Sequence, residues 1–154
     1  MIDFFDTKYY YDIFICFSLF IILVTFLHTL VLRMEESKNI KYLQSIGLLV
    51  FLLTTIYMGL RPISPHFTDM TTYAAHFNRY ANGYPITSKS DITFHLFMKY
   101  CAKIMSPNIF FMTCTLFYIY PMFLISKKYF GKYWFYSFIM FIVSFSFWSY
   151  GVNG

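Results

Sequence analysis

Charge is what this sequence most conspicuously lacks. Charged residues make up only 12% of the 154, whereas apolar residues make up 58%. That excludes an ordinary soluble domain, in which about 25% of residues are charged. The formal net charge of +5 comes from basic residues scattered between apolar runs, and no continuous basic patch indicates a nucleic-acid partner. The composition therefore predicts an integral membrane protein that binds no nucleic acid.

Cysteine and catalytic signatures are also scarce. The chain has three cysteines, an odd number, all in apolar segments: Cys16, Cys101 and Cys114. This set excludes a disulfide framework and a CxxC metal knuckle, and we interpret the three as packing residues. The sequence contains no HExxH, GxSxG, P-loop or GxGxxG motif, so no metal or other cofactor is inferred.

Four apolar stretches are suited to crossing a membrane as helices. They are residues 13–32, 43–60, 109–125 and 133–148. The first is too long for a signal peptide and lacks a small-residue cleavage site, so it stays as the first span. Its single ionisable residue, His28, lies near the end, where we expect a helix-packing or interfacial histidine; a ligand or proton relay is the alternative.

The expected fold class is all-α, a polytopic transmembrane helical protein with about four spans. Residues 1–154 form a single membrane domain, which we expect to be the N-terminal fragment of a longer protein. Between the second and third spans, residues 92–105 form a further segment with apolar residues at helical spacing. Another face carries a polar stripe at i, i+4 spacing, formed by His95, Lys99 and Lys103.

This polar stripe bears on whether residues 92–105 cross the membrane. Two lysines near the bilayer centre would cost about 2.5–3.5 kcal/mol each, more than the few large aliphatic residues return. We therefore expect an interfacial or re-entrant amphipathic helix here. A true span with snorkelling lysines is the alternative.

The basic residues of the short loops predict the orientation. Residues 33–41 and residues 126–132 carry three Lys or Arg each, which places both loops in the cytoplasm. The N-terminus and the loop 61–108 then lie outside the cell or in the periplasm. The expected localisation is a multi-pass protein of the cytoplasmic membrane.

The most polar stretch begins where the second span ends, and it runs from Gly59 to Tyr73. Arg61 is a cation at headgroup depth, and a guanidinium is well suited to bidentate binding of phosphate or diphosphate. The alternative is a snorkelling arginine that ends the helix. Pro62 and Pro65 break the helix and stiffen the turn.

A new helix is expected after this turn, capped by Thr68 or Asp69. Its aromatic face at i, i+4, i+7 spacing consists of Tyr73, Phe77 and Tyr80. Asp69 is either this cap or a general base or sugar-hydroxyl acceptor, and the two alternatives stay open. Further hydrogen-bonding groups are His66, His76 and Arg79.

Three features occur together in this chain: Gly-Leu-Arg at 59–61, Thr-Asp at 68–69 followed by Tyr73, and an aromatic, serine-rich segment at 144–154. In this combination the chain resembles the EpsG-type, Wzy-like polysaccharide polymerases. Those proteins typically have Gly-x-Arg after an early span, Gly-Thr-Asp before a spaced tyrosine, and a serine-rich span before Gly-x-x-x-Arg. Phe67 stands where the family usually has the glycine of Gly-Thr-Asp, and such polymerases are longer chains.

The resemblance implies a metal-independent membrane glycosyltransferase. It would join undecaprenyl-diphosphate-linked repeat units in exopolysaccharide, capsule or O-antigen synthesis. By carry-over, Arg61 contacts the diphosphate or holds the acceptor loop, Asp69 binds or deprotonates a sugar hydroxyl, and Tyr73 lines the glycan groove. His66 and Arg79 are further substrate-binding candidates.

The partners implied by this resemblance are the lipid-linked oligosaccharide, membrane lipid and other polysaccharide assembly proteins. Two other classes of function stay open. A transporter or channel fragment would place paired ionisable groups within the spans. A non-catalytic membrane subunit would use the polar loop only to bind a partner.

Overall fold

The computed structural model of the chain describes residues 7–31, 37–88, 90–144 and 147. In this part of the chain the regular structure is entirely helical, which confirms the all-α fold class. The elements in order are a 3₁₀ turn (Thr7–Tyr9), α1 (Tyr10–Val31), α2 (Ser37–Gly59), α3 (Thr68–Ala81), α4 (Ile92–Cys101), α5 (Pro107–Phe130), a second 3₁₀ turn (Gly131–Tyr133) and α6 (Trp134–Val143).

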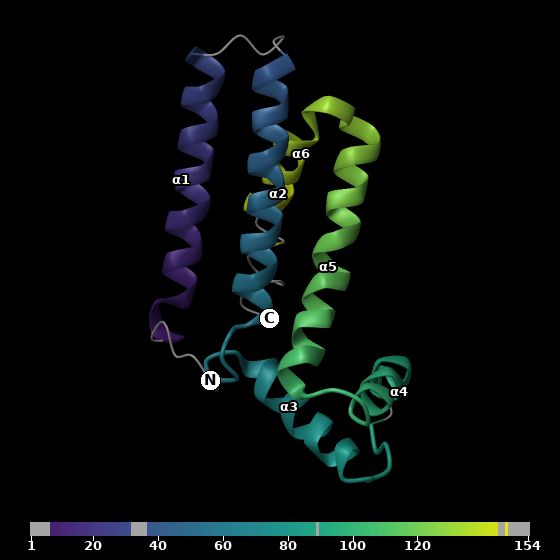
Figure 1. Cartoon of the computed structure of the whole chain (residues 1–154). Helices are drawn as coiled ribbons and strands as arrows, with labels where there is room; N and C mark the ends of the chain where they lie inside the picture. Colours follow the sequence, from purple (N-terminus) through teal and green to yellow (C-terminus); the bar gives the residue numbers. More distant parts are fainter. Residues whose placement is uncertain (1–6, 32–36, 89, 145–146, 148–154) are drawn as a thin grey trace.

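Three stretches of these helices are long and apolar enough to cross a membrane, which indicates a membrane protein. They are Thr7–Val31, Lys38–Gly59 and Pro107–Val143. The third contains a reversal, because the chain turns back at Gly131–Tyr133 and α6 returns behind α2 (Figure 1). With 24 residues, α5 is about 36 Å long, whereas the ten residues of α6 rise only about 15 Å.

The helix ends differ most from the predicted boundaries in three places. The second helix begins at Ser37, not at 43, and α5 continues to Phe130 through the predicted loop 126–132. Lysine is a good helix former, so a polar segment need not end a helix. Gly131 ends α5, because its φ of +52° is a conformation that favours glycine. The predicted fourth span, 133–148, stops being α-helical after Val143.

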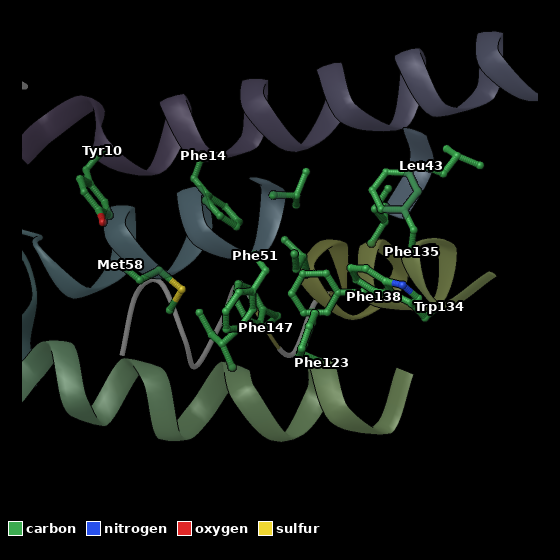
Figure 2. Close-up of a cluster of buried hydrophobic side chains, with 14 of the residues drawn as sticks. Tyr10, Phe14, Leu43, Phe51, Met58, Phe123, Trp134, Phe135, Phe138 and Phe147 are labelled. Carbon is green, nitrogen blue, oxygen red and sulfur yellow. The ribbon is translucent and has the colours of Figure 1, made fainter. Parts of the chain in front are cut away.

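The main core lies where α2, α5 and α6 meet, with α1 packed on one side (Figure 2). Phe123 lies at its centre, with ring centroids 4.6 Å from Phe51 and 5.1 Å from Trp134. Gly47 permits the close approach of α2 and α6, because a Cβ there would lie 2.5 Å from Cη2 of Trp134. By contrast α1 buries only three side chains, which are Tyr10, Phe14 and Ser18.

A second core joins α3 and α4 to the start of α5. Phe110 is fully buried in it, with ring centroids 5.1 Å from Phe77 and 5.6 Å from Phe97. Phe77 and Tyr80 are buried and Tyr73 is half-buried, which confirms the predicted aromatic face. The ten residues of α4 rise about 15 Å, half the thickness of a hydrocarbon core.

The two ends of the helix bundle differ (Figure 1). The polar end, residues 60–106, follows the C-terminal end of α2 and contains α3 and α4. The lysine end lies opposite, where α2 begins and α5 turns into α6. Its described basic residues are Lys38, Lys41, Lys127, Lys128 and Lys132. The described lysines of the predicted loops 33–41 and 126–132 therefore share one end; Arg33 lies outside the described residues.

Two packing predictions have a mixed outcome. His28 stacks on Tyr42 of α2, with ring centroids 6.1 Å apart, which confirms a helix-packing histidine. Cys101 is buried and Cys114 half-buried against the second core, as packing residues should be. For Cys16 the prediction is wrong, because it lies on the exposed surface of α1. The sequence could not distinguish a core-facing from an outward-facing position, because α1 is apolar all round.

Candidate functional site

The turn that carries the candidate site starts where α2 and α5 nearly touch. A Cβ on Gly59 would lie 3.1 Å from Cα of Met112, so only glycine allows this approach. The amide of Leu60 closes the last helical turn by donating to the carbonyl of Ile56 at 2.9 Å. Glycine two residues before Arg61 therefore has a packing reason, which is to bring the start of α5 to the site.

Arg61 is half-buried and lies on an aromatic ring. Its Cζ is 5.0 Å from the ring centroid of Phe67, a cation–π geometry, and Phe67 is itself only 3% exposed. Burial lowers the pKa of the Arg61 guanidinium, while Tyr10 acts in the opposite direction. The group stays charged at neutral pH, since an arginine is not deprotonated in proteins. The site thus holds a partly desolvated cation at the end of α2.

An aromatic pair lies beneath this cation. Tyr10 and Tyr57 stack with ring centroids 4.3 Å apart and exchange hydrogen bonds. The Tyr10 hydroxyl donates to the Tyr57 carbonyl, and the Tyr57 hydroxyl donates to the Tyr10 carbonyl at 2.6 Å. The ring of Phe67 meets Tyr10 edge-on, with centroids 5.2 Å apart. This pair connects α1 to α2 next to the polar turn.

Our sequence interpretation missed Tyr10, because it lies before the predicted first span. A signal was present, since tyrosine clusters mark membrane interfaces and residues 9–11 are all tyrosine. What the sequence could not supply was the partner, 47 residues away along the chain.

Asp69 lies in the first turn of α3 and its side chain is exposed. The predicted cap is wrong: the N-cap position belongs to Phe67, and no side chain makes a cap hydrogen bond there. A carboxylate in the first turn still interacts favourably with the helix dipole. Phe67 has φ −105°, a conformation open to any residue, so this turn does not require the family's glycine.

His66 is brought to the same place as Arg61. It is exposed, its ring centroid lies 6.5 Å from that of Phe67, and its backbone amide donates to Ser64 Oγ at 3.3 Å. Arg61 and His66 thus both lie near the Phe67 ring, and Asp69 follows Phe67 by two residues in the first turn of α3. We call these three residues the Phe67 cluster. The cluster brings a cation, an imidazole and a carboxylate into one short stretch around the Phe67 ring.

Tyr73 and Arg79 lie apart from the Phe67 cluster. The Tyr73 ring packs edge-on against Phe94 of α4, with centroids 5.3 Å apart. Arg79 is exposed over the ring of Tyr84 at 5.9 Å, and it is ten residues from Asp69, about 15 Å along α3. Arg79 and Asp69 therefore cannot hold the same small group.

An open groove between α4 and α5 borders the second core. It has a volume of about 510 Å³, and its lining residues are Asp91, Thr93, Phe94, Phe97 and Phe117. Asp91 is the one described non-glycine residue with positive φ, at +52°. Strained backbone of this kind often occurs at ligand sites. Aromatic faces beside a carboxylate and a hydroxyl suit a ligand that is part apolar and part polar.

The predicted polar stripe on residues 92–105 is wrong at His95. His95 is 5% exposed and faces α3, where its Nδ1 lies 2.9 Å from the Tyr80 hydroxyl. The ring of His76 meets it edge-on, with centroids 5.3 Å apart. A hydrogen bond offsets the free-energy cost of burying an imidazole. Helical periodicity alone cannot reveal the partner in such a bond. Lys103 is exposed and Lys99 half-buried, as members of the stripe.

Within the described residues, no three His, Cys, Asp or Glu side chains gather as metal ligands would. No protein-family model, curated protein or solved structure matches this chain. The fold and the site together define an all-helical membrane protein with a charged cluster at one end of its bundle.

Proposed function

We propose that this chain belongs to a membrane glycosyltransferase of the polysaccharide polymerase type. It would join undecaprenyl-diphosphate-linked repeat units into exopolysaccharide, capsule or O-antigen. The observation that carries the proposal is Arg61, half-buried at the end of α2 and 5.0 Å above the Phe67 ring. A fixed guanidinium at headgroup depth suits a lipid-linked diphosphate, because its planar fork matches phosphate oxygens.

The proposed topology has four crossings, with α6 as the start of the fourth. In this topology α4 lies in the interface without crossing, consistent with its length of ten residues. The lysine end faces the cytoplasm and the polar end faces outward, by the positive-inside rule. Support comes from the start of α2, which carries Lys38 and Lys41 and lies at the same end of the bundle as the turn between α5 and α6 (Figure 1). The protein would then reside in the cytoplasmic membrane.

Roles within the site follow from position. Arg61 contacts the diphosphate, and Asp69, exposed two residues after Phe67, binds or deprotonates a sugar hydroxyl. His66 adds a hydrogen-bonding group beside them. Tyr73 and Arg79 lie further along α3, so in this proposal they contact the glycan at a distance from the diphosphate. The aromatic groove beside α4 offers stacking surfaces for sugar rings.

The first experiment measures polymer formation in cells that carry the gene with Arg61→Ala. We expect the polymer to lose its long chains while lipid-linked repeat units are still made and accumulate. Arg61→Lys keeps the charge but loses the bidentate fork, so it should restore only part of the elongation. Gel electrophoresis gives the chain length, and mass spectrometry of extracted lipids gives the repeat units.

Matched controls separate a specific site from a loss of surface charge. Lys103→Ala removes an exposed cation at the same end, and Asp12→Asn neutralises an exposed carboxylate near the start of α1. Both controls should leave chain length unchanged, whereas Asp69→Asn should shorten it. If Arg61→Ala and Asp69→Asn leave the polymer intact at normal protein levels, the polymerase proposal is wrong and a non-catalytic subunit is favoured.

A further inference from the structure

A second pocket lies at the lysine end, on the opposite side of the bundle from the Phe67 cluster. It opens between α2 and the α5–α6 turn, with a volume of about 280 Å³. Its lining residues are Gln44, Leu48, Lys127, Gly131 and Trp134. The pocket thus combines an ammonium, an amide and apolar surface at the position where a helix bundle meets lipid headgroups.

Lys127 is exposed, and its ammonium lies near two aromatic rings. Its Nζ lies 4.7 Å from the ring centroid of Phe123 and 5.6 Å from that of Trp134. Cation–π contacts favour this position of the ammonium and leave its N–H groups able to donate to an anion. Among the described residues no carboxylate pairs with Lys127.

The wall behind Lys127 is rigid. Trp134 is 2% exposed and packs over Gly47, where a Cβ would lie 2.5 Å from its Cη2. Just below, the buried hydroxyls of Ser126 and Ser137 are 3.3 Å apart and join α5 to α6. A pocket with a fixed wall needs little reorganisation to bind a ligand, which favours affinity.

The apolar surface around Leu48 favours a lipid over a soluble anion as the ligand. Leu48 lines the pocket yet is 46% exposed on α2, where it begins an outward apolar strip that continues with Leu49 and Leu52. An anion with acyl chains can place its phosphate beside Lys127 and its chains along this strip. A free phosphate gains only the polar contacts.

The surrounding charge favours an anion. Lys41, Lys128 and Lys132 lie at the same end of the bundle, and two of the helix ends here, those of α2 and α6, are N-termini. Their dipoles attract an anion, while the C-terminal ends of α1 and α5 oppose it, so the helix dipoles largely cancel. Among the described residues the lysines therefore make the potential at this end positive. In the sequence, Glu35 and Glu36 join α1 to α2 outside the described residues.

We propose that this pocket binds the phosphate of an anionic phospholipid. Lys127 and Gln44 contact the phosphate oxygens, and Trp134 and Leu48 contact the glycerol and the first acyl carbons. The bound lipid would anchor the α5–α6 turn at the membrane surface, as basic pockets between transmembrane helices do. The proposal uses no residue of the Phe67 cluster and does not depend on glycosyltransferase activity.

The test measures lipid binding by the purified full chain in phosphatidylcholine nanodiscs. Phosphatidylglycerol is titrated in, and bound lipid is counted by native mass spectrometry. Lys127→Gln should weaken binding about fivefold, the effect expected for one lysine at an anionic membrane surface. Lys128→Gln is the matched control, because Lys128 is exposed on the same turn and does not line the pocket. It should have a smaller effect.

A second variant and a second ligand complete the test. Gln44→Leu changes no charge, so a loss of binding there supports a shaped pocket. Glycerol phosphate, which lacks acyl chains, should compete weakly; equal competition would mean a site for soluble phosphate and would overturn the lipid proposal. Equal losses for Lys127→Gln and Lys128→Gln, with none for Gln44→Leu, would also overturn it and leave a diffuse basic surface.

Discussion

The two ends of this bundle obtain their polar groups in different ways. At the polar end, α3 and α4 add a layer with its own aromatic core, and the Phe67 cluster lies where that layer joins α2. At the lysine end no further layer of described residues covers the helices, and the described charges are lysines of two stretches, at the start of α2 and around the end of α5. The polar end thus has a separate layer that carries both signs of charge, whereas the lysine end carries positive charge on the ends of α2 and α5 and on the turn between α5 and α6.

This difference separates what each end can do. A layer with a core can hold side chains from distant parts of the chain in fixed positions, as Tyr10 and Tyr57 beneath Phe67 illustrate. Fixed positions are what recognition of a specific substrate requires. The lysine end offers one shaped pocket within a basic surface, which suits a class of anion rather than one molecule.

The largest expected effect is on the added layer itself. Phe110→Ala removes the fully buried ring that contacts Phe77 and Phe97, and it should cost about 3–5 kcal/mol. The loss should be local, so amide hydrogens of α3 and α4 should exchange faster while those of α2 stay protected. Phe117→Ala, which removes a 64% exposed ring, is the matched control. Equal loss of protection in α2 would show that the two ends are one cooperative unit.

Two glycines of α2 allow close contact with another helix: Gly59 with α5 and Gly47 with α6. Gly59→Ala should cost about 1–3 kcal/mol, because the added methyl meets the backbone of Met112 at 3.1 Å. Gly47→Ala meets only side-chain atoms, Cη2 of Trp134 at 2.5 Å and Cδ2 of Phe135 at 2.9 Å. We expect thermal unfolding in detergent to show destabilisation in both. Gly59→Ala should also weaken ligand binding at Arg61. Unchanged binding would mean that the close approach of α2 and α5 at Gly59 does not position Arg61.

Buried polar pairs provide a third comparison. Tyr80→Phe leaves Nδ1 of the buried His95 without its partner at 2.9 Å, which should cost about 1–3 kcal/mol. Ser126→Ala breaks the hydroxyl pair with Ser137 at the other end, whose 3.3 Å separation indicates a weaker bond. Chemical denaturation should therefore rank Tyr80→Phe as the more destabilising. The reverse order would show that the α3–α4 layer depends less on its polar pair than the α5–α6 turn does.

The smallest expected effect is at the tyrosine pair. Tyr10→Phe keeps the stacked ring but removes the hydroxyl that donates to the Tyr57 carbonyl, which should cost about 0.5–1.5 kcal/mol. Tyr9→Phe is the control, since Tyr9 is 51% exposed. Hydrogen exchange of the first turns of α1 should rise in the first variant only. Equal exchange in both would mean that the stacked rings alone hold α1 to α2.

Much of the helical architecture could be predicted from apolar length. Residues 13–32 and 43–60 lie mostly within α1 and α2, because about 20 apolar residues form a helix in a membrane. The boundaries were less accurate, since the lysines before residue 43 continue the helix and do not end it. The early end of α6 at Val143, with Ser144 in an extended conformation, left no signal in composition.

The candidate site was predicted only in part. The sequence placed Arg61 beside a proline-containing turn and the aspartate after it, because these residues are neighbours along the chain. It did not show that Phe67 lies under the guanidinium, nor that His95 faces Tyr80 in the interior. Those are contacts between elements, and helical periodicity gives the angle of a residue on its helix but not what lies opposite.

Three features could be predicted from the sequence by itself. They are the membrane environment, the helical class and the separation of the lysines of residues 38–41 and 127–132 from the polar stretch 59–73. Each depends on composition or on distance along the chain, and a membrane tolerates few alternatives to a helix. Only the tertiary structure decided which polar side chains share a site and which lie apart. Gly59, Tyr10 and Phe67 come from three different segments, and their packing holds Arg61 where it is. Such packing depends on contacts across the chain, so no local pattern contains it.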